Sequence, residues 1–592
     1  MENNEPQLNK IRHSAAHLLA FAVKELWKDT KIAIGPVIEE GFYYDFDFAK
    51  PISEEDLDKI EKKMLELSKQ NFEFVQEWIS VEKARELFKG ESYKLEIIEE
   101  IEKGKRDDFG KKGEVSIYKS GSFVDLCKGP HVQKIEEVKA FKLLSLAGAY
   151  WKGDEKNKML TRVYGTAFES KKDLEKYLEM LEEAKKRDHR RLGKELDLFT
   201  FSDLVGAGLP LYTAKGTTIR NQLYKSLLGI SKKYGVQEVT IPHMAKIDLY
   251  KISGHAEKFA DELFKVVSHY KEEFVLKPVN CPHHTQIYAS KPRSYRDLPI
   301  RMIESTQQHR DEKPGQIGGL TRTRSFTVDD GHTFCTVNQI RQEALNICKI
   351  IEEFYKGLGL WGNHWVSLSV RDYKNMDKYI GEAKDWEKAE NMIQEISNEL
   401  NLKGKIMEGE AAIYGPKIDY MFKDALGNER QLATVQIDFA MPKRFGLTYI
   451  NEKGEEVTPV MLHRAILGSY ERFLAIIIEH FAGAFPVWLS PIQVQIITIN
   501  ESVLEYANKI KNELESLDIR VEIDEKQETM QNKIRKAQEQ KIPYMLIVGD
   551  KEKAQNKVSI RTRENEQHNF IGILEFEKVI KNIVESKSLK TW

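Results

Sequence analysis

FTVDDGHTFC, at residues 326–335, and PVMLHRAILGSYERF, at residues 459–473, are two largely apolar stretches that each carry a histidine. They lie in a region, from about residue 197 to residue 488, in which glycine-containing loops alternate with apolar strands. The phosphate-loop signature GxxxxGK(S/T) is not found in the chain, so a nucleotide would have to bind without that loop. We therefore predict one large domain of strands and loops over residues 197–490.

The preceding residues predict an N-terminal α+β domain over residues 1–169. Residues 53–69 are expected to form a helix that Ser53 caps, because apolar residues recur on one of its faces. These apolar residues are Leu57, Ile60, Met64 and Leu67. Strand-like pieces at residues 41–44 and 114–118 surround the helix.

Two further segments flank the large domain. Residues 170–193 predict a charged helix with Gly193 as its C-cap, and we assign residues 170–196 to a linker between domains. From Pro491 onward, the apolar runs VQIITI, VEI and YMLIVG alternate with helical segments. This alternation is typical of an α/β domain with a largely parallel sheet, which we place at residues 491–592.

Composition indicates a multidomain enzyme of a reducing compartment. The 592 residues allow about three or four domains. Lys and Arg number 91 against 93 Asp and Glu, which excludes a globally basic nucleic-acid binder but allows local basic patches. Four scattered cysteines are too few for a disulfide framework, and no export signal or membrane span is recognisable, so we expect a cytoplasmic protein.

Two pairs of potential ligands stand in the N-terminal region. His13 and His17 are four residues apart and would share one helix face, and Cys127 and His131 follow Asp125 far downstream. Cys and His bind zinc or activate water, so the two pairs together predict one site. The alternative is that these are ordinary surface or core histidines, since HxxxH is commonplace.

A second group of candidates lies in the large domain. Cys281, His332 and His463 have ligand chemistry, but the 50 and 130 residues between them match no short zinc signature. On residue type alone, a buried thiol and hydrogen-bonded histidines are the simpler interpretation. Four arginines could clamp phosphates through forked donors, or could be solvated charges. They are Arg310, Arg322, Arg324 and Arg472.

An ordered series of short segments runs through nearly the whole chain. The N-terminal segments are RHSAAHLL, IGPVIEEGFYYDF, GESYK, DLCKGPH, AGAYWKGD, NKMLTRVYGTAF and KKRDHRRLGKELDLF. The central ones are LKPVNCPHH, SYRDLPIRMIE, HRDE, FTVDDGHTFC, YGPKID, TVQIDF and PVMLHRAILGSYERF, and the last are PYMLIVGDKE and VSIRTR. This series resembles the bacterial threonyl-tRNA synthetases.

The resemblance implies the domain types and the activity. It implies an N-terminal α+β editing domain, a class II catalytic domain built on an antiparallel sheet, and a C-terminal α/β anticodon-binding domain. The implied enzyme activates L-threonine with ATP, transfers it to the 3′-terminal adenosine of tRNA(Thr), and hydrolyses mischarged seryl-tRNA(Thr).

The resemblance also assigns the threonine site. Cys281, His332 and His463 would hold one Zn²⁺ per subunit, with positions left open for the amino group and hydroxyl of threonine. Valine lacks the hydroxyl, so such a site discriminates against it better than an apolar pocket does. Asp330 and Tyr414 would bind threonine beside the metal.

An ATP site with Mg²⁺ on the phosphates is implied in the same domain. Arg310, in HRDE, would hold the α-phosphate, and Arg472 would stack on adenine opposite Phe326. The two arginines are thus the expected catalytic residues. Arg322 would hold the outer phosphates, and Gln436 would support ATP through hydrogen bonds.

A hydrolytic site is expected because serine shares the hydroxyl of threonine. One missing methyl group discriminates by only about 1–3 kcal/mol. The resemblance places the site at the two N-terminal pairs, with Lys94 and Asp125 as partners in water activation and without a bound metal. The implied editing residues are His13, His17, Lys94, Asp125, Cys127 and His131.

In the C-terminal domain, Glu552 and Arg561 are implied to contact anticodon bases, and Arg535 the tRNA backbone. Pro242, in VQEVTIPHM, matches the first class II motif, which builds a homodimer interface. The chain opens at the editing segments, so the small ubiquitin-like domain that commonly comes first in this family is expected to be missing.

Two residues depart from the family pattern near the threonine site. CPGH reads CPHH at His283, and FTQDD reads FTVDD at Val328, which leaves their effect on substrate recognition open. Two other functions are compatible with these residues: a synthetase-like protein that no longer charges tRNA, and a metallohydrolase centred on the N-terminal histidines. Threonine-dependent ATP–pyrophosphate exchange and zinc stoichiometry distinguish these from a synthetase.

Overall fold

The computed structural model describes residues 5–106, 110–111, 113–424, 427 and 429–592. These residues fall into two units, which divide between Glu182 and Glu183, within helix α5 (Lys171–Arg187). No helix in this described part of the chain is long and apolar enough to cross a bilayer. The domain limits expected from the sequence remain predictions.

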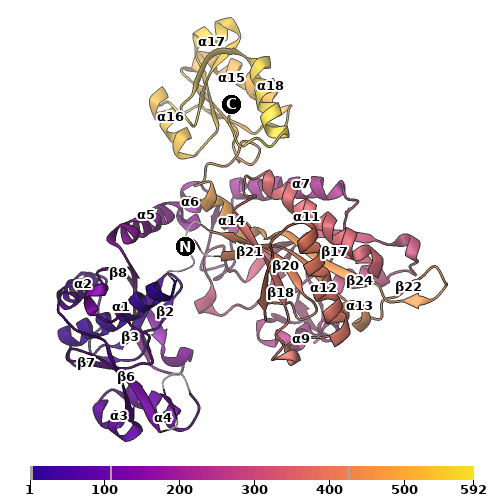
Figure 1. The fold of residues 1–592 in the computed structure, drawn as a ribbon. Coiled ribbons are helices and arrows are strands. Elements are labelled where there is room, and N and C mark those ends of the chain that lie inside the picture. Colours follow the sequence, from indigo (N-terminus) through magenta and orange to yellow (C-terminus); the bar gives the residue numbers. More distant parts are fainter. Residues whose placement is uncertain (1–4, 107–109, 112, 425–426, 428) are drawn as a thin grey trace. The chain divides into compact units, whose positions relative to one another are not determined.

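The N-terminal unit, indigo to purple in Figure 1, combines helices with two sheets and ends within α5. Its elements are α1 (Glu5–Leu26), β1 (Lys31–Ile32), β2 (Val37–Ile38), β3 (Gly41–Asp47), α2 (Glu55–Ser68), β4 (Val75–Ser80), α3 (Val81–Leu87), α4 (Ser92–Glu102), β5 (Gly110–Lys111), β6 (Glu114–Ser120), β7 (Phe123–Leu126), β8 (Ala140–Tyr150) and β9 (Met159–Phe168). The first sheet has the order β1-β3-β9-β8, with β2 on β3, and the second has the order β4-β6-β5, with β7 on β6. Apolar side chains of α1 fill the core between α2 and the first sheet.

The local predictions for this unit are confirmed except at one helix end. The strand-like pieces correspond to β3 and β6, and α2 buries the four predicted apolar residues. The predicted cap at Ser53 is wrong, because Glu54 is the N-cap and makes no side-chain hydrogen bond there. The backbone N–H of Ser53 instead donates to Asp56 at 3.0 Å. The carboxylate of Asp56, in the first turn of α2, thus accepts the backbone N–H of Ser53, the residue that was expected to cap the helix.

The predicted single helix over residues 170–193 is also wrong. Two helices occupy this segment, α5 and α6 (His189–Glu195), and Asp188 separates them with non-helical backbone angles and accepts a hydrogen bond from the N–H of Arg190. Gly193 lies inside α6 instead of ending a helix. A Cβ atom there would come within 2.2 Å of the ring of Phe199, so close packing requires this glycine.

The second unit begins with a large α/β region (Figure 1). Its elements are α6, β10 (Phe199–Thr200), β11 (Leu211–Tyr212), α7 (Ala214–Lys232), β12 (Gln237–Glu238), β13 (Met244–Lys246), α8 (Ile247–Ser253), α9 (His255–Lys258), β14 (Lys265–Val267), β15 (Glu273–Leu276), α10 (Cys281–Ala289), β16 (Ile300–His309), β17 (Ser325–Cys335), α11 (Ile340–Lys356), β18 (His364–Val370), α12 (Ala383–Glu399), β19 (Lys405–Glu408), β20 (Lys417–Lys423), β21 (Glu429–Asp438), α13 (Ala440–Arg444), β22 (Tyr449–Ile450), β23 (Glu456–Val457), β24 (Val460–Ser469) and α14 (Tyr470–His480).

An eight-stranded sheet, in the order β12-β16-β17-β24-β21-β20-β18-β19, organises this region. The strands from β16 to β18 pair antiparallel, which confirms the expected antiparallel catalytic sheet. Successive side chains of a strand point to opposite faces. Leu462 on β24 therefore joins the large apolar core with α7, α11 and α14, while the neighbouring His463 lies on the opposite face.

The C-terminal region, yellow in Figure 1, contains a five-stranded sheet in the order β26-β25-β27-β28-β29. Its elements are β25 (Val494–Thr498), α15 (Leu504–Glu515), β26 (Val521–Asp524), α16 (Met530–Glu539), β27 (Tyr544–Val548), α17 (Asp550–Gln555), β28 (Lys557–Thr562), β29 (Gln567–Gly572) and α18 (Ile573–Glu585).

The predicted parallel pairing holds for only part of this C-terminal sheet. β26, β25 and β27 are parallel, whereas β27, β28 and β29 are antiparallel, so the expectation of a largely parallel sheet is wrong for its second half. A parallel crossover needs a dozen or more residues. Residues 549–556, between β27 and β28, are too few for one.

Candidate functional site

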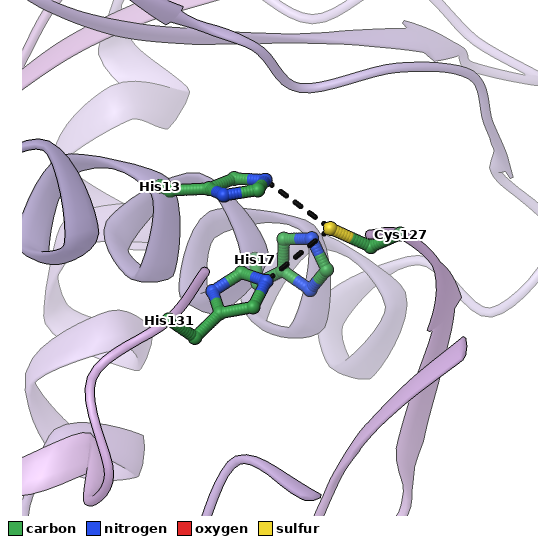
Figure 2. A group of neighbouring side chains, drawn as sticks. All are labelled: His13, His17, Cys127 and His131. Atoms are coloured by element: carbon green, nitrogen blue, oxygen red, sulfur yellow. Dashed lines mark hydrogen bonds between the residues drawn. The ribbon is translucent and has the colours of Figure 1, made fainter. Parts of the chain in front are cut away.

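Four side chains meet in the N-terminal unit, and we call them the N-terminal cluster: His13, His17, Cys127 and His131 (Figure 2). The first two lie on one face of α1, and the other two follow β7. The Sγ atom of Cys127 lies 3.3 Å from Nε2 of His13 and 3.3 Å from Nε2 of His131. The potential ligand atoms of all four residues lie within 4.8 Å of one another.

Hydrogen bonds join three members of the cluster, namely His13, Cys127 and His131. Nδ1 of His13 faces the carbonyl oxygen of Pro130 at 3.2 Å, which places the proton of that ring on Nδ1 and leaves Nε2 to accept from the thiol. Ser14 accepts the N–H of Val132, so its hydroxyl donates to Nδ1 of His131 at 3.1 Å. Nε2 of His131 then donates to the sulfur.

Burial keeps the N-terminal cluster uncharged. It raises the pKa of the Cys127 thiol to about 12, so the thiol stays protonated near neutral pH. It also lowers the pKa of His13, and it holds the pKa values of His17 and His131 well below their ordinary value. The three rings are neutral and can exchange hydrogen bonds with water or a substrate.

A buried ion pair lies beside the cluster. Nζ of Lys94, on α4, is 2.5 Å from Oδ1 of Asp125, and both side chains are 2% exposed. The hydroxyl of Tyr44, on β3, donates to Oδ2 of Asp125 at 2.6 Å and lies 3.1 Å from Lys94. Nε2 of His17 is 3.7 Å from the same carboxylate. The pair is thus fixed by three elements and joined to the cluster.

A cavity of about 390 Å³ opens onto these groups. Its lining includes His13, His17, Lys94, Asp125 and Cys127, together with apolar and backbone surface around residues 34–37 and 126–130. The ring of His131, the remaining cluster member, stacks on Phe74 with centroids 4.9 Å apart. The arrangement can hold a small polar substrate and hydrogen-bond a water molecule against it.

The second set of candidate ligands, which we call the central triad, consists of Cys281, His332 and His463. Cys281 begins α10, and His332 and His463 face each other across the β17–β24 pair. Nε2 of His332 is 3.1 Å from Nδ1 of His463. All three side chains are buried, and their potential ligand atoms lie within 4.8 Å of one another. The structure therefore assembles three residues that are distant in the sequence.

Outer hydrogen bonds show that the central triad suits a metal ion. Nε2 of His463 faces Oδ2 of Asp438, at the end of β21, at 2.9 Å. This carboxylate–histidine contact leaves Nδ1 free as a ligand, as is usual at metal sites. Burial raises the pKa of Cys281 well above its ordinary value and lowers that of His332 well below. A metal ion would displace the proton of the Cys281 thiol, and one thiolate with two neutral imidazoles is a ligand set that suits zinc.

The two predicted threonine-binding residues border the triad. Oδ1 of Asp330 lies 3.6 Å from Nε2 of His332. The ring of Tyr414 stacks on His463, with centroids 4.4 Å apart and planes at 19°. The hydroxyl of Tyr414 donates to Gln436 at 2.8 Å, and Gln436 pairs with His463 across the β21–β24 ladder. Asp330, Tyr414 and Gln436 therefore each lie next to one of the two histidines of the triad.

Three arginines predicted to bind ATP lie near one another. Burial and the nearby charges of Arg430, Arg310 and Arg322 lower the pKa of Arg472. Several positively charged side chains are therefore close to Arg472. The guanidinium of Arg310 lies 5.2 Å from the ring centre of Phe326. Arg310 and Arg472 are half-buried and Arg322 is exposed, and such a concentration of positive charge favours a polyanionic ligand.

Other contacts of these arginines are with protein groups. Arg322 contacts Glu312 at 2.8 Å, and Nε of Arg472 donates to the carbonyl of Thr321 at 3.3 Å. Arg324 lies 3.6 Å from Asp311 and donates to a backbone carbonyl, so the structure pairs it within the protein.

The three predicted anticodon residues lie in the C-terminal region. The carboxylate of Glu552, on α17, accepts from the N–H of Gly549 and from the hydroxyl of Ser559. Arg561, on β28, donates to Asn565 at 2.8 Å, and Arg535, on α16, is ion-paired with Glu539. Glu552 is 9% exposed, whereas the Arg535 side chain is 60% exposed.

The residue patterns missed four site residues: Tyr44, His255, His284 and Asp438. Tyr44 and Asp438 lie in the quoted segments IGPVIEEGFYYDF and TVQIDF, but only their contacts reveal them. His284 contacts His332 at 2.7 Å. Burial lowers the pKa of His255, near Tyr414, to about 3. A histidine doublet in CPHH was the one available signal for His284.

Three families of known proteins match successive parts of the chain. Residues 264–481 match the family described as tRNA synthetase class II core domain (G, H, P, S and T), and residues 493–583 match the anticodon binding domain. Residues 115–164 match the threonyl and alanyl tRNA synthetase second additional domain. The antiparallel sheet with its triad and arginines thus belongs to a class II aminoacyl-tRNA synthetase.

Full-length relatives specify the family. A threonine–tRNA ligase of Gloeobacter violaceus is 47% identical over 600 residues, covering 100% of this chain and 94% of the relative. One of a Geobacillus species is 46% identical and covers 97% and 88%. A solved RNA-binding domain of threonyl-tRNA synthetase from Cryptosporidium parvum is 34% identical, with a TM-score of 0.64 over 67% of this chain and 98% of that one. The chain belongs to the threonine–tRNA ligase family.

Proposed function

We propose that this chain activates L-threonine with ATP, transfers it to the 3′-terminal adenosine of tRNA(Thr), and hydrolyses seryl-tRNA(Thr). The observation that carries the synthetic activity is the central triad, whose two histidines lie on β17 and β24, next in the chain to the segments that bear the arginines. Arg322 precedes β17, and Arg472 lies in α14, which follows β24. An amino-acid site beside a polyphosphate site is what adenylate formation requires.

Cys281, His332 and His463 are proposed to hold one zinc ion per subunit. When bound, the metal supplies a Lewis acid with open positions for the amino group and hydroxyl of threonine. Asp330, 3.6 Å from His332, is placed to accept a hydrogen bond from either group. The Tyr414 ring, which stacks on His463, would form one side of the threonine site. These contacts favour threonine over valine, which offers no hydroxyl.

The arginine group is proposed to bind ATP together with Mg²⁺. Arg310 and Arg322 would neutralise the phosphates, and the first of them would stabilise charge that develops at the α-phosphate. Phe326 and Arg472 would enclose adenine, which requires the Arg310 guanidinium that now lies over Phe326 to turn toward the phosphates. Gln436 would support ATP through hydrogen bonds, although Tyr414 already donates to it.

The N-terminal cluster is proposed to be the editing site. Its neutral rings and protonated thiol are suited to hold and orient water, and the high pKa of Cys127 argues against a thiolate nucleophile. The Lys94–Asp125 pair would orient the ester or the attacking water at the cavity wall. As the resemblance to the family implies, this editing site is proposed to work without a bound metal.

Two further partners are proposed. The C-terminal region would bind the anticodon through Glu552, Arg561 and Arg535, by analogy with the matched domain type. The segment that includes Pro242 would form a homodimer interface, and light scattering that gives the mass of a single chain at micromolar concentration would contradict this.

Cys281→Ala tests the synthetic activity. We expect it to lose zinc and threonine-dependent ATP–pyrophosphate exchange, because two remaining ligands cannot hold the metal in an open site. Cys348→Ala is the matched control, since this thiol is also buried but packs in the apolar core behind the sheet. ATP–pyrophosphate exchange by the metal-free variant at the wild-type rate would contradict the metal assignment. Absence of this exchange in the wild type would indicate a synthetase-like protein without the activity.

A further inference from the structure

A second histidine of α10 lies against the central triad. His284 follows Cys281 by three residues, and its side chain is fully buried. Its Nδ1 atom is 2.7 Å from Nδ1 of His332, and the two rings meet edge to face, with centroids 4.7 Å apart and planes at 86°. Residues three apart lie on one helix face, so α10 supplies both the cysteine ligand and a contact to a histidine ligand.

The contacts of His332 give this hydrogen bond a direction. A histidine binds a metal as a neutral ring, through the nitrogen that carries no proton. Nε2 of His332 faces Nδ1 of His463 at 3.1 Å and is therefore the ligand atom. The proton of His332 is then on Nδ1, which donates to Nδ1 of His284.

Glu304 completes the chain of contacts. With Nδ1 of His284 as the acceptor, the proton of that ring is on Nε2, which faces Oε2 of Glu304 at 3.7 Å. Both of these atoms are buried, and neither has a hydrogen-bond partner among the residues that the structure describes. The other carboxylate oxygen accepts the backbone N–H of Ile241 at 2.9 Å, which holds Glu304 in place on β16.

We propose that His284 and Glu304 are positioning residues that hold His332 in the tautomer and orientation that bind the metal. The proposal rests on the metal site assigned above. Without an acceptor at the position of His284, the proton of His332 is free to occupy Nε2, where it blocks the ligand atom. Outer partners of this kind change metal affinity about 10- to 100-fold.

Zinc affinity of the purified full-length enzyme, measured by competition with a chromophoric chelator, tests the proposal. His284→Leu removes the acceptor at similar volume and should weaken zinc binding about 10- to 100-fold. His284→Asn places a polar atom where Nδ1 was, so it should restore affinity to within about threefold of wild type. Glu304→Gln should give a smaller loss than His284→Leu, because it keeps an acceptor but removes the charge.

His283→Gly is the matched control. His283 is the neighbouring residue on α10, and no hydrogen bond joins its ring to the central triad among the residues that the structure describes. This change should leave zinc affinity within about twofold of wild type, because His283 does not contact the triad through a hydrogen bond.

Each outcome decides one point. Equal affinities of wild type, His284→Leu and Glu304→Gln would overturn the proposal, as would an equal loss in His283→Gly, which would indicate a general disturbance of α10. If His284→Leu does not fold, the other two variants decide. Weaker zinc binding by Glu304→Gln, with affinity retained in His284→Asn, supports the positioning role, and unchanged zinc affinity in Glu304→Gln refutes it. A wild-type enzyme that binds no zinc would instead remove the metal site itself.

Discussion

The Lys94–Asp125 ion pair allows a quantitative test of the N-terminal unit. Both side chains are 2% exposed, and the ammonium nitrogen lies 2.5 Å from the carboxylate. Lys94→Met would leave the Asp125 carboxylate buried, with the Tyr44 hydroxyl and the N–H of Leu126 as its remaining donors. Removing one partner of a buried pair costs about 3–5 kcal/mol, because the other charge is left uncompensated. We expect a loss of that size in the stability of this unit.

Native-state hydrogen exchange of the full-length protein measures this loss locally. At about 1.4 kcal/mol per tenfold, amides of α4 and β7 that exchange by unfolding of the unit should exchange faster by roughly two to four powers of ten. Lys119→Met is the matched control in the same unit. Lys119 is 2.7 Å from Glu77, but these side chains are 43% and 39% exposed, so this pair should contribute no more than about 1 kcal/mol.

A double change separates charge from packing. Lys94→Met with Asp125→Leu should recover part of the stability, since no unpaired charge remains, although Tyr44 loses its acceptor. Both variants should lose seryl-tRNA hydrolysis and keep threonylation. The reasoning is refuted if Lys94→Met speeds exchange no more than Lys119→Met, or if the double variant is less stable than the single one.

Three other predictions concern the separate activities. Cys127→Ala should accumulate seryl-tRNA(Thr) while threonylating near normally, because the sulfur joins two rings of the editing cluster, and deacylation of purified seryl-tRNA at the wild-type rate would mean that the cluster is structural. Val328→Gln should lower the threonine KM several-fold if an amide there orients the substrate, and steady-state kinetics showing an equal or higher KM would mean that another group serves this position. Glu552→Ala should change discrimination between anticodon variants more than Arg535→Ala does, since base contacts carry sequence information and phosphate contacts carry affinity. Equal, uniform weakening of charging by both variants would leave only a general RNA-binding role.

Local sequence patterns predicted elements better than their ends. The apolar face of α2 follows from helical periodicity, which involves only residues three or four apart. The start of α2 and the break at Asp188 depend instead on which of several polar side chains binds the free backbone N–H groups. In the C-terminal sheet, strand and helix alternation was visible, but the direction of β28 depends on the short connection at residues 549–556.

For the candidate sites too, the sequence predicted the residue types but not their arrangement. The amino-acid sequence alone, through its ordered motifs, determined the family, the domain types and the residue types available for metal, phosphate and water chemistry. The spacings of 50 and 130 residues did not predict that the three residues of the central triad meet in space.

Only the tertiary structure placed His332 opposite His463 and added Asp438 and His284 behind them. It likewise buried Lys94 against Asp125 beside the N-terminal cluster. The physical reason is that contacts between strands are set by register and packing over the whole sheet, and that burial, which shifts each pKa and selects each hydrogen bond, arises only when distant segments come together.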